Sequence, residues 1–68
     1  MQTIYMIIPG RDETEGVISF SRDDNGYLVW SARWEYVYCT DQNGDRTVQA
    51  EFTTDTLDKA SNWLHDTM

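Results

Sequence analysis

The sequence has a single cysteine, a single histidine and a single proline in 68 residues. Because Cys39 is alone, an internal disulfide and a cluster of cysteine metal ligands are excluded, and a reducing, cytoplasmic setting is expected. The longest apolar run, from Ile4 to Ile8, is far shorter than the roughly 20 residues of a membrane helix. The N-terminal residues also lack the basic start and the cleavage site of a signal peptide, so we expect neither secretion nor membrane insertion.

Basic side chains are also scarce. Five Lys and Arg stand against twelve Asp and Glu, which gives a net charge of −7. A field of this sign repels nucleic acid and anionic membranes and attracts basic surfaces, so we expect no direct binding to either of the first two. A charge of this size is also common in small domains, where it serves solubility. The charge alone therefore does not decide between a basic partner and a solvated surface.

Large side chains compensate for the short length of the chain. Three Trp, four Tyr and two Phe can each bury about 150–250 Å². A chain of this length forms one compact domain, residues 1–68, and an acidic disordered segment would lack so many aromatics. We expect the core to combine the three tryptophans with apolar residues of the predicted strands and helix: Trp30, Trp34, Trp63, Phe20, Leu28, Phe52, Leu57 and Leu64.

Alternating apolar residues predict four strands. These are Met1 to Ile8, Val17 to Ser21, Tyr27 to Thr40 and Arg46 to Thr53. The third strand is unusually long, so we expect it to curl or to carry a bulge near Ser31-Ala32. The segments 22–26 and 41–45 both contain Asn-Gly, which supplies the positive φ angles of tight hairpin turns.

Beyond the fourth strand the apolar spacing changes to that of one face of a helix. Leu57, Ala60, Trp63 and Leu64 share this face. Thr54 or Asp55 can cap the start of the helix, and Asp55 and Asp58 lie favourably near the positive end of its dipole. The predicted fold class is α+β: a four-stranded antiparallel β-meander with one C-terminal helix packed on one face.

Residues that could perform catalysis or bind a metal are few. His65 is expected to be an exposed cation near the end of the helix, and Cys39 a small buried hydrophobe. The acidic turns resemble fragments of a calcium-binding loop, but neither continues to the glutamate that completes such a loop. There is also no glycine-rich phosphate loop. We therefore expect no enzymatic activity, no metal and no cofactor.

In a meander, successive loops alternate between the two ends of the sheet, so the acidic residues of the loops fall into two groups, one at each end. The loop 9–16 and the turn 41–45 share one end, and the turn 22–26 shares the other end with the start of the helix. Two glutamates lie along the strands between the ends and form a bridging pair. The candidate partner-binding residues are the acids of the turns together with this pair: Asp12, Glu13, Glu15, Asp23, Asp24, Asp41, Asp45, Glu35 and Glu51. Duplex DNA also presents fixed and spaced charges, so such acids could occupy a groove built for phosphates.

These features are similar to those of the small acidic inhibitors that phages and other mobile elements encode. In style the chain resembles anti-CRISPR proteins that act on type I surveillance complexes. The likeness covers the whole chain and rests on its length, its twelve acids, the turns Asp23-Asp24-Asn25-Gly26 and Asp41-Gln42-Asn43-Gly44-Asp45, and the helix 54–68. No shared motif carries it, so no residue role is transferred. The resemblance implies a monomeric inhibitor in the cytoplasm of a host bacterial cell, occupying the basic DNA-binding surface of a host or Cas protein complex.

Three functions are consistent with the sequence. The first is an acidic inhibitor that blocks DNA recognition by DNA mimicry. The second is a small phage regulator that binds a polymerase or repressor through its sheet or helix without mimicry, and the third is an acidic accessory protein. The salt dependence of binding distinguishes the first function from the other two, because only a charge-driven complex weakens steeply as ionic strength rises. The sequence also leaves open whether an exposed strand edge pairs with a second copy.

Overall fold

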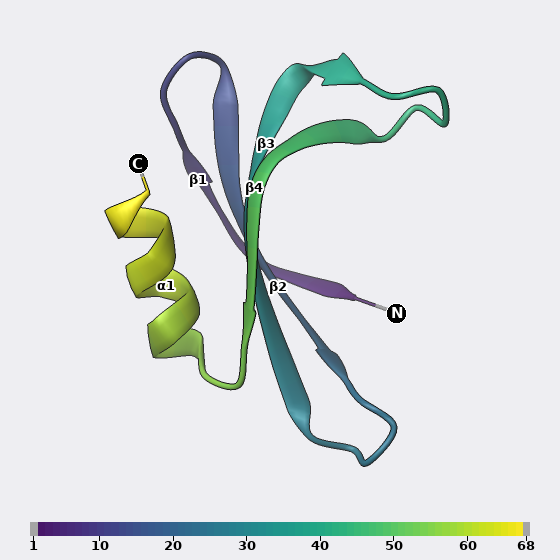
Figure 1. Ribbon diagram of the computed structural model, residues 1–68, viewed down its shortest axis with the longest axis vertical. Helices are drawn as coiled ribbons and strands as arrows, with labels where there is room; N and C mark the ends of the chain where they lie inside the picture. Colours follow the sequence, from purple (N-terminus) through teal and green to yellow (C-terminus); the bar gives the residue numbers. More distant parts are fainter. Residues whose placement is uncertain (1, 68) are drawn as a thin grey trace.

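The computed structural model describes residues 2–67 as a single antiparallel sheet followed by one helix (Figure 1). The elements are β1 (Thr3–Pro9), β2 (Thr14–Arg22), β3 (Leu28–Thr40), β4 (Arg46–Thr54) and α1 (Leu57–Asp66). The strands lie in the order β1-β2-β3-β4, and α1 packs on β2, β3 and β4. The predicted α+β meander with one C-terminal helix is confirmed.

The second strand begins earlier than the sequence pattern indicates, at Thr14 rather than Val17. Its first residues are hydrogen-bonded on both sides, since Gly16 pairs with Ile8 of β1 and with Trp34 of β3. The polar and glycine residues of this segment resemble a loop, but pairing with two neighbours makes them part of the sheet. Met1, the predicted start of the first strand, lies outside the described residues.

The bulge expected near Ser31-Ala32 is not there. Both residues pair regularly with β2 and β4, and the irregular pairing of β3 with β4 falls further along, around Glu35. Ser31 and Ala32 are buried at the centre of the sheet, where a regular ladder is needed to pair the backbone groups. The β3–β4 hairpin curls only beyond this point, where it bends away from the rest of the sheet (Figure 1).

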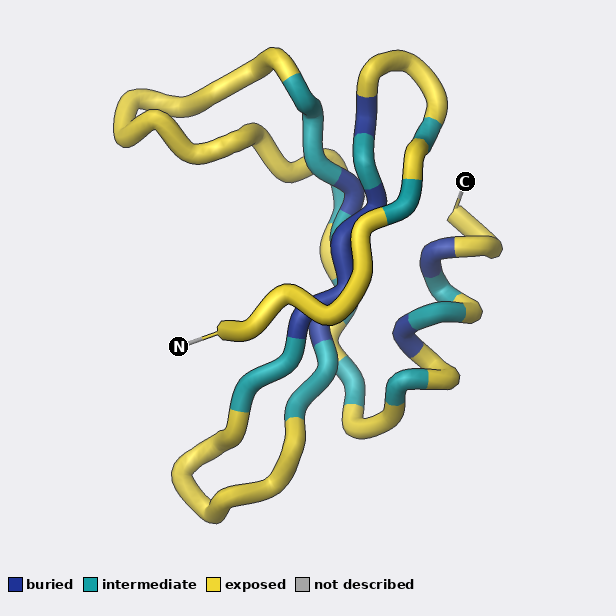
Figure 2. The backbone as a smooth tube through the Cα atoms, turned by 180° about the vertical axis from the view of Figure 1, so that it is seen from behind, coloured by how far each residue is buried: buried dark blue, intermediate teal, exposed yellow. Residues whose placement is uncertain are grey.

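The core lies between the sheet and the helix, and Figure 2 shows the buried backbone segments gathered there. Its buried members come from β2, β3 and α1: Ile18, Ala32, Trp34, Ala60 and Leu64. Trp30, Leu57 and Trp63 are partly buried against them, so most of the predicted core is confirmed. The two buried alanines, which the prediction omitted, allow the helix and the sheet to approach closely.

The remaining predicted core residues lie at its margins or outside it. Phe20 and Phe52 are partly buried, with Phe20 tilted against Trp30 and Phe52 stacked on Trp63. The prediction for Leu28 is wrong: it is 38% exposed, because it pairs with Arg22 beside the β2–β3 turn. The prediction that Cys39 is buried is also wrong. Cys39 is exposed near the end of β3, in the part of the hairpin that projects from the core.

The helix starts later than the expected caps. Thr56, rather than Thr54 or Asp55, is the N-cap, and its hydroxyl accepts a hydrogen bond from the Lys59 amide at 3.3 Å. Asp58 lies in the first turn and His65 in the last, as expected from the helix dipole.

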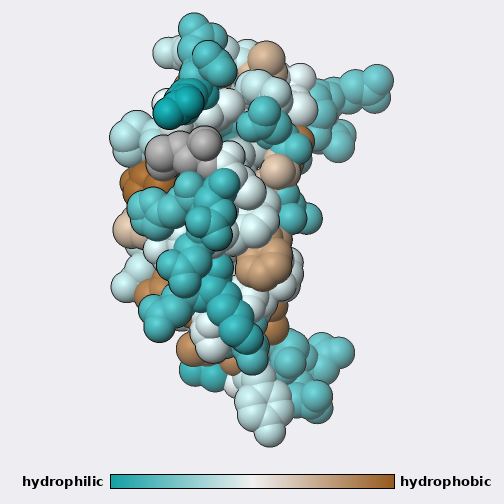
Figure 3. All heavy atoms as spheres, turned by 60° about the vertical axis from the view of Figure 1, so that its left-hand side comes forward, coloured by the Kyte–Doolittle hydropathy of each residue, from teal (hydrophilic) through white to brown (hydrophobic). Residues whose placement is uncertain are grey.

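The outward face that includes the helix is mostly hydrophilic (Figure 3). Within residues 2–67 no helix has the length and apolar character needed to cross a membrane.

Candidate functional site: the acidic turns

The turns after β2 and β3 are built in the same way around an aspartate. Asp23 Oδ1 accepts hydrogen bonds from the amides of Asn25 at 2.9 Å and Tyr27 at 3.0 Å. Asp41 Oδ1 accepts from the second and fourth residues that follow it, at 2.9 and 3.0 Å. Each of these carboxylates therefore stabilises its own turn, and the turns hold their other residues in fixed positions.

Positive φ in these two turns occurs only at glycine. Gly26 and Gly44 both have φ of 85°, whereas neither asparagine of the Asn-Gly pairs is left-handed. The expected contribution of asparagine to positive φ is thus wrong, and each turn is a three-residue loop closed by a backbone pair, Asp23–Tyr27 or Asp41–Asp45. A left-handed glycine that follows the turn matches the longer class of hairpin loop.

The tightest turn is the one after β1, and its two central residues are acidic. Asp12 and Glu13 have φ of 55° and 63°, and the Thr14 amide donates to the Arg11 carbonyl across them at 3.1 Å. Residues other than glycine rarely adopt this left-handed backbone conformation, because it costs them roughly 1–2 kcal/mol each. The Val37 amide anchors the turn to β3 by donating to the Glu13 carbonyl at 2.9 Å. The chain therefore holds two adjacent carboxylates at one end of the sheet.

Two of the acids on the strands, Glu15 on β2 and Glu35 on β3, are paired with arginines. Glu35 accepts from Arg33 Nε at 2.6 Å, and Glu15 accepts from Arg46 at 2.6 Å. Arg46 also lies 3.8 Å from Glu35, which links the two pairs across β2, β3 and β4. Glu35 is largely shielded from solvent, with 14% of its side chain exposed. The charges of this part of the sheet are therefore largely compensated.

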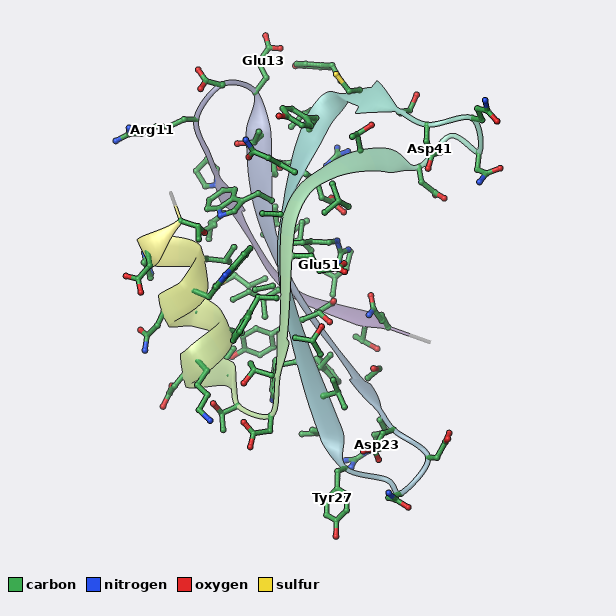
Figure 4. All side chains as sticks on the ribbon, viewed as in Figure 1. Arg11, Glu13, Asp23, Tyr27, Asp41 and Glu51 are labelled. Atoms are coloured by element: carbon green, nitrogen blue, oxygen red, sulfur yellow. The ribbon has the colours of Figure 1, made fainter. Side chains whose placement is uncertain are left out.

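The other predicted acids are exposed and make no side-chain hydrogen bond or ion pair within the described part of the chain. We call them the unpaired acids: Asp12, Glu13, Asp24, Asp45 and Glu51. Glu13 and Asp41 mark one end of the molecule, Asp23 marks the other, and Glu51 lies between them on β4 (Figure 4). The molecule measures 35 × 28 × 15 Å, so the acidic turns are separated along its longest dimension.

The helix start adds acids to the end that carries Asp24, as the meander predicts. Lys59 donates a hydrogen bond to Asp55 Oδ1 at 3.3 Å, and this bond together with the lysine charge lowers the pKa of Asp55 below its ordinary value. Asp58 is also exposed, in the first turn of α1. Asp55 and Asp58 are not among the candidate partner-binding residues predicted from the sequence. They nevertheless lie at the end of the sheet where the alternation of loops in a meander places them.

Two exposed aromatic residues flank the acidic turns. Tyr27 is 71% exposed beside Asp23, and Tyr38 is 77% exposed near the other end of β3. Strict alternation along β3 would put Tyr38 on the same face as Trp34, but it lies in the part of the hairpin that projects beyond the helix. Exposed tyrosines are typical of contact surfaces, because the ring supplies area and the hydroxyl a hydrogen bond.

A small hollow of about 210 Å³ lies beside the β1–β2 turn. Its walls combine polar side chains with two aromatic rings: Arg11, Asp12, Thr14, Trp34, Tyr36, Gln49 and Thr67. Within residues 2–67 no group of three His, Cys, Asp or Glu side chains is arranged to hold a metal ion. The hollow is smaller than the roughly 300–1,000 Å³ usual for small-molecule sites, so the acidic turns remain the main candidate.

Comparison of the chain with protein-family models, with curated proteins and with solved structures found no match.

Proposed function

We propose that the protein is an acidic inhibitor that binds a nucleic-acid-handling complex and blocks its recognition of DNA by mimicking DNA charge. The target we favour is a CRISPR–Cas surveillance complex of type I. One observation carries this proposal: exposed acids occupy turns at both ends of an elongated molecule with a net charge of −7. A basic surface that binds DNA is the natural complement of such a body.

The dimensions and stiffness of the molecule support mimicry. Its longest extent of 35 Å is close to one turn of duplex DNA, about 34–36 Å. The hairpin turns are fixed by the hydrogen bonds of Asp23 and Asp41, so their neighbours Asp24 and Asp45 are held before binding. Preorganised charges lose less conformational entropy on binding than charges on mobile loops.

Individual contacts in this proposal are weak and act together. A single exposed ion pair is worth only about 0–1 kcal/mol, so no one acid determines the affinity. Several acids that face one basic surface add their contributions and also speed association by steering. This role requires no catalysis, metal, cofactor or direct binding to nucleic acid, and a monomer is sufficient for it.

Competition with DNA tests the proposal. A panel of purified type I surveillance complexes is incubated with labelled target duplex and increasing amounts of the protein, and the bound DNA is measured. We expect the protein to displace DNA or prevent its binding to at least one complex, with the effect reduced by excess duplex. If the protein binds a complex without affecting its DNA, or the inhibition is insensitive to added duplex, mimicry is wrong and regulation without mimicry becomes the better account.

A further inference from the structure

The edge strand β1 is apolar and exposed on both of its faces. Four consecutive residues are well exposed: Ile4 at 57%, Tyr5 at 52%, Met6 at 37% and Ile7 at 49%. The helix packs on β2, β3 and β4, and Figure 2 shows β1 running exposed along the side of the sheet. Edge strands in monomeric proteins usually carry charges that prevent pairing with another chain, because their unpaired backbone groups can bind a further strand.

This strand lacks such charges. The first ten residues are the longest uncharged segment of the sequence, although the whole chain carries a net charge of −7. The other edge strand, β4, contains Arg46 and Glu51. Two copies that met at their acidic turns would repel each other, whereas two copies that met along β1 would bring together strands that carry no charge.

We infer that β1 pairs with β1 of a second copy of this chain. The two strands run antiparallel about a two-fold axis, which joins two four-stranded sheets into one of eight strands. An antiparallel contact of identical strands is self-complementary, as a closed dimer requires. A basic partner would find no acid on this strand, so charge favours a second copy over the partner of the acidic turns.

The pairing has limits that make the dimer weak. The register of β1 against β2 shifts between Ile4 and Met6, where the rings of Tyr5 and Trp30 form a T-shaped pair with centroids 5.3 Å apart. Pro9 ends the strand and has no amide hydrogen to donate. A contact of one short strand falls among the small interfaces, below about 1,200 Å² in total, that form transient complexes. The protein is therefore a monomer when dilute and a dimer when concentrated.

Salt has the opposite effect on this dimer and on the proposed inhibitory complex. Two bodies of charge −7 repel each other, and raising the salt from about 0.1 M to 1 M shortens the screening length from about 10 Å to 3 Å. Salt should therefore strengthen the dimer while it weakens binding to a basic target. Because the two respond in opposite directions, failure of one proposal is distinguishable from failure of the other.

Sedimentation equilibrium of the full chain over a concentration series at both salt concentrations tests the inference. We expect the apparent mass to rise from 8.0 kDa toward twice that value as concentration increases, at lower concentration in high salt. Ile7→Lys should keep the protein monomeric over the whole series, because it places a charge on the pairing edge. Val48→Lys is the matched control, since Val48 is 42% exposed on the opposite edge strand, and it should dimerise like the original chain.

Ile4→Lys is the second test variant, in case Ile7→Lys lowers the thermal midpoint. Loss of dimerisation in a folded lysine variant of β1, with dimerisation retained in the β4 control, supports the inference. If the protein is a monomer at all concentrations in high salt, the inference is overturned, and a strand of another protein becomes the better candidate to pair with β1. A dimer that survives both β1 substitutions, or that only Val48→Lys disrupts, would also overturn it.

Discussion

The indole Nε1 of Trp34 donates a 2.9 Å hydrogen bond to the hydroxyl of Thr67, which itself donates to the Trp63 carbonyl at 2.7 Å. This chain of two bonds joins the centre of the sheet to the last turn of the helix. Trp34 is only 3% exposed, so its N–H would otherwise be poorly hydrated. The contact fixes the position of the helix relative to the end of the sheet that carries Asp12 and Glu13.

Replacing Thr67 by valine should destabilise the protein. The substitution keeps the shape of the side chain but removes the hydroxyl, which leaves the Trp34 N–H without its acceptor. We expect a loss of about 1–2 kcal/mol in the free energy of unfolding, measured by urea denaturation. Thr53→Val is the control, because Thr53 is exposed on β4 and should change stability by less than about 0.5 kcal/mol. Equal effects of the two substitutions would show that the hydrogen bond contributes nothing.

Gly16 makes room for the ring of Trp34, its cross-strand neighbour. A Cβ atom at this position would lie 3.0 Å from two ring carbons of Trp34 and from Ile8 Cγ1. We expect Gly16→Ala to cost about 1–3 kcal/mol and to alter the near-UV circular dichroism of the buried tryptophan. Gly44→Ala should cost backbone energy at its φ of 85° but leave that spectrum unchanged, because open space surrounds it. An unchanged spectrum for both variants would contradict the close packing of Gly16 against Trp34.

The sequence was sufficient to predict the sheet order, the helix and the two largest hairpin turns. Period-two alternation and the change to helical spacing at Leu57 carry this information locally. The strand start at Thr14 could not be read in this way, because it depends on pairing with β1 and β3 rather than on apolar residues. Leu28 was misplaced for a related reason: alternation gives the face of a strand but not how far along it the helix reaches.

The candidate site was predictable only in part. Loop order placed the acids at two ends, but the sequence could not separate those that stabilise the molecule from those that are unpaired. Asp23 and Asp41 accept backbone hydrogen bonds within their turns, and Glu35 contacts arginine along the same strand. The Glu15–Arg46 pair joins residues from β2 and β4, so it depends on the pairing of both strands with β3. The exposed edge of β1 likewise becomes evident only when the reach of the helix is known.

The strained turn after β1 offers a stabilising substitution. Glu13 has φ of 63°, a conformation that asparagine adopts more readily than glutamate. Glu13→Asn should therefore raise the free energy of unfolding by about 0.5–1 kcal/mol, measured by thermal or urea denaturation. Glu51→Gln is the control for loss of charge, since Glu51 lies in an ordinary strand. A gain of equal size in both variants would mean that relief of charge repulsion, not of backbone strain, is responsible.

Charge reversal at the two ends of the molecule tests directly whether the acidic turns bind the target. Glu13→Lys with Asp45→Lys changes one end, and Asp24→Lys with Asp55→Lys changes the other. Each double variant replaces two negative charges by two positive ones, so both go from −7 to −3 and differ only in where the change lies. Asp23 and Asp41 are left in place because their carboxylates stabilise the turns.

The measurement is the affinity of each variant for the type I surveillance complex that the unmodified protein inhibits, in about 0.1 M and 1 M salt. We expect both variants to keep the circular dichroism of the original fold. At low salt at least one of them should lose affinity by tenfold or more, since ion pairs worth up to about 1 kcal/mol each become repulsions. That difference should shrink at high salt. If both variants fold correctly and still bind with unchanged affinity at low salt, the acidic turns do not form the contact.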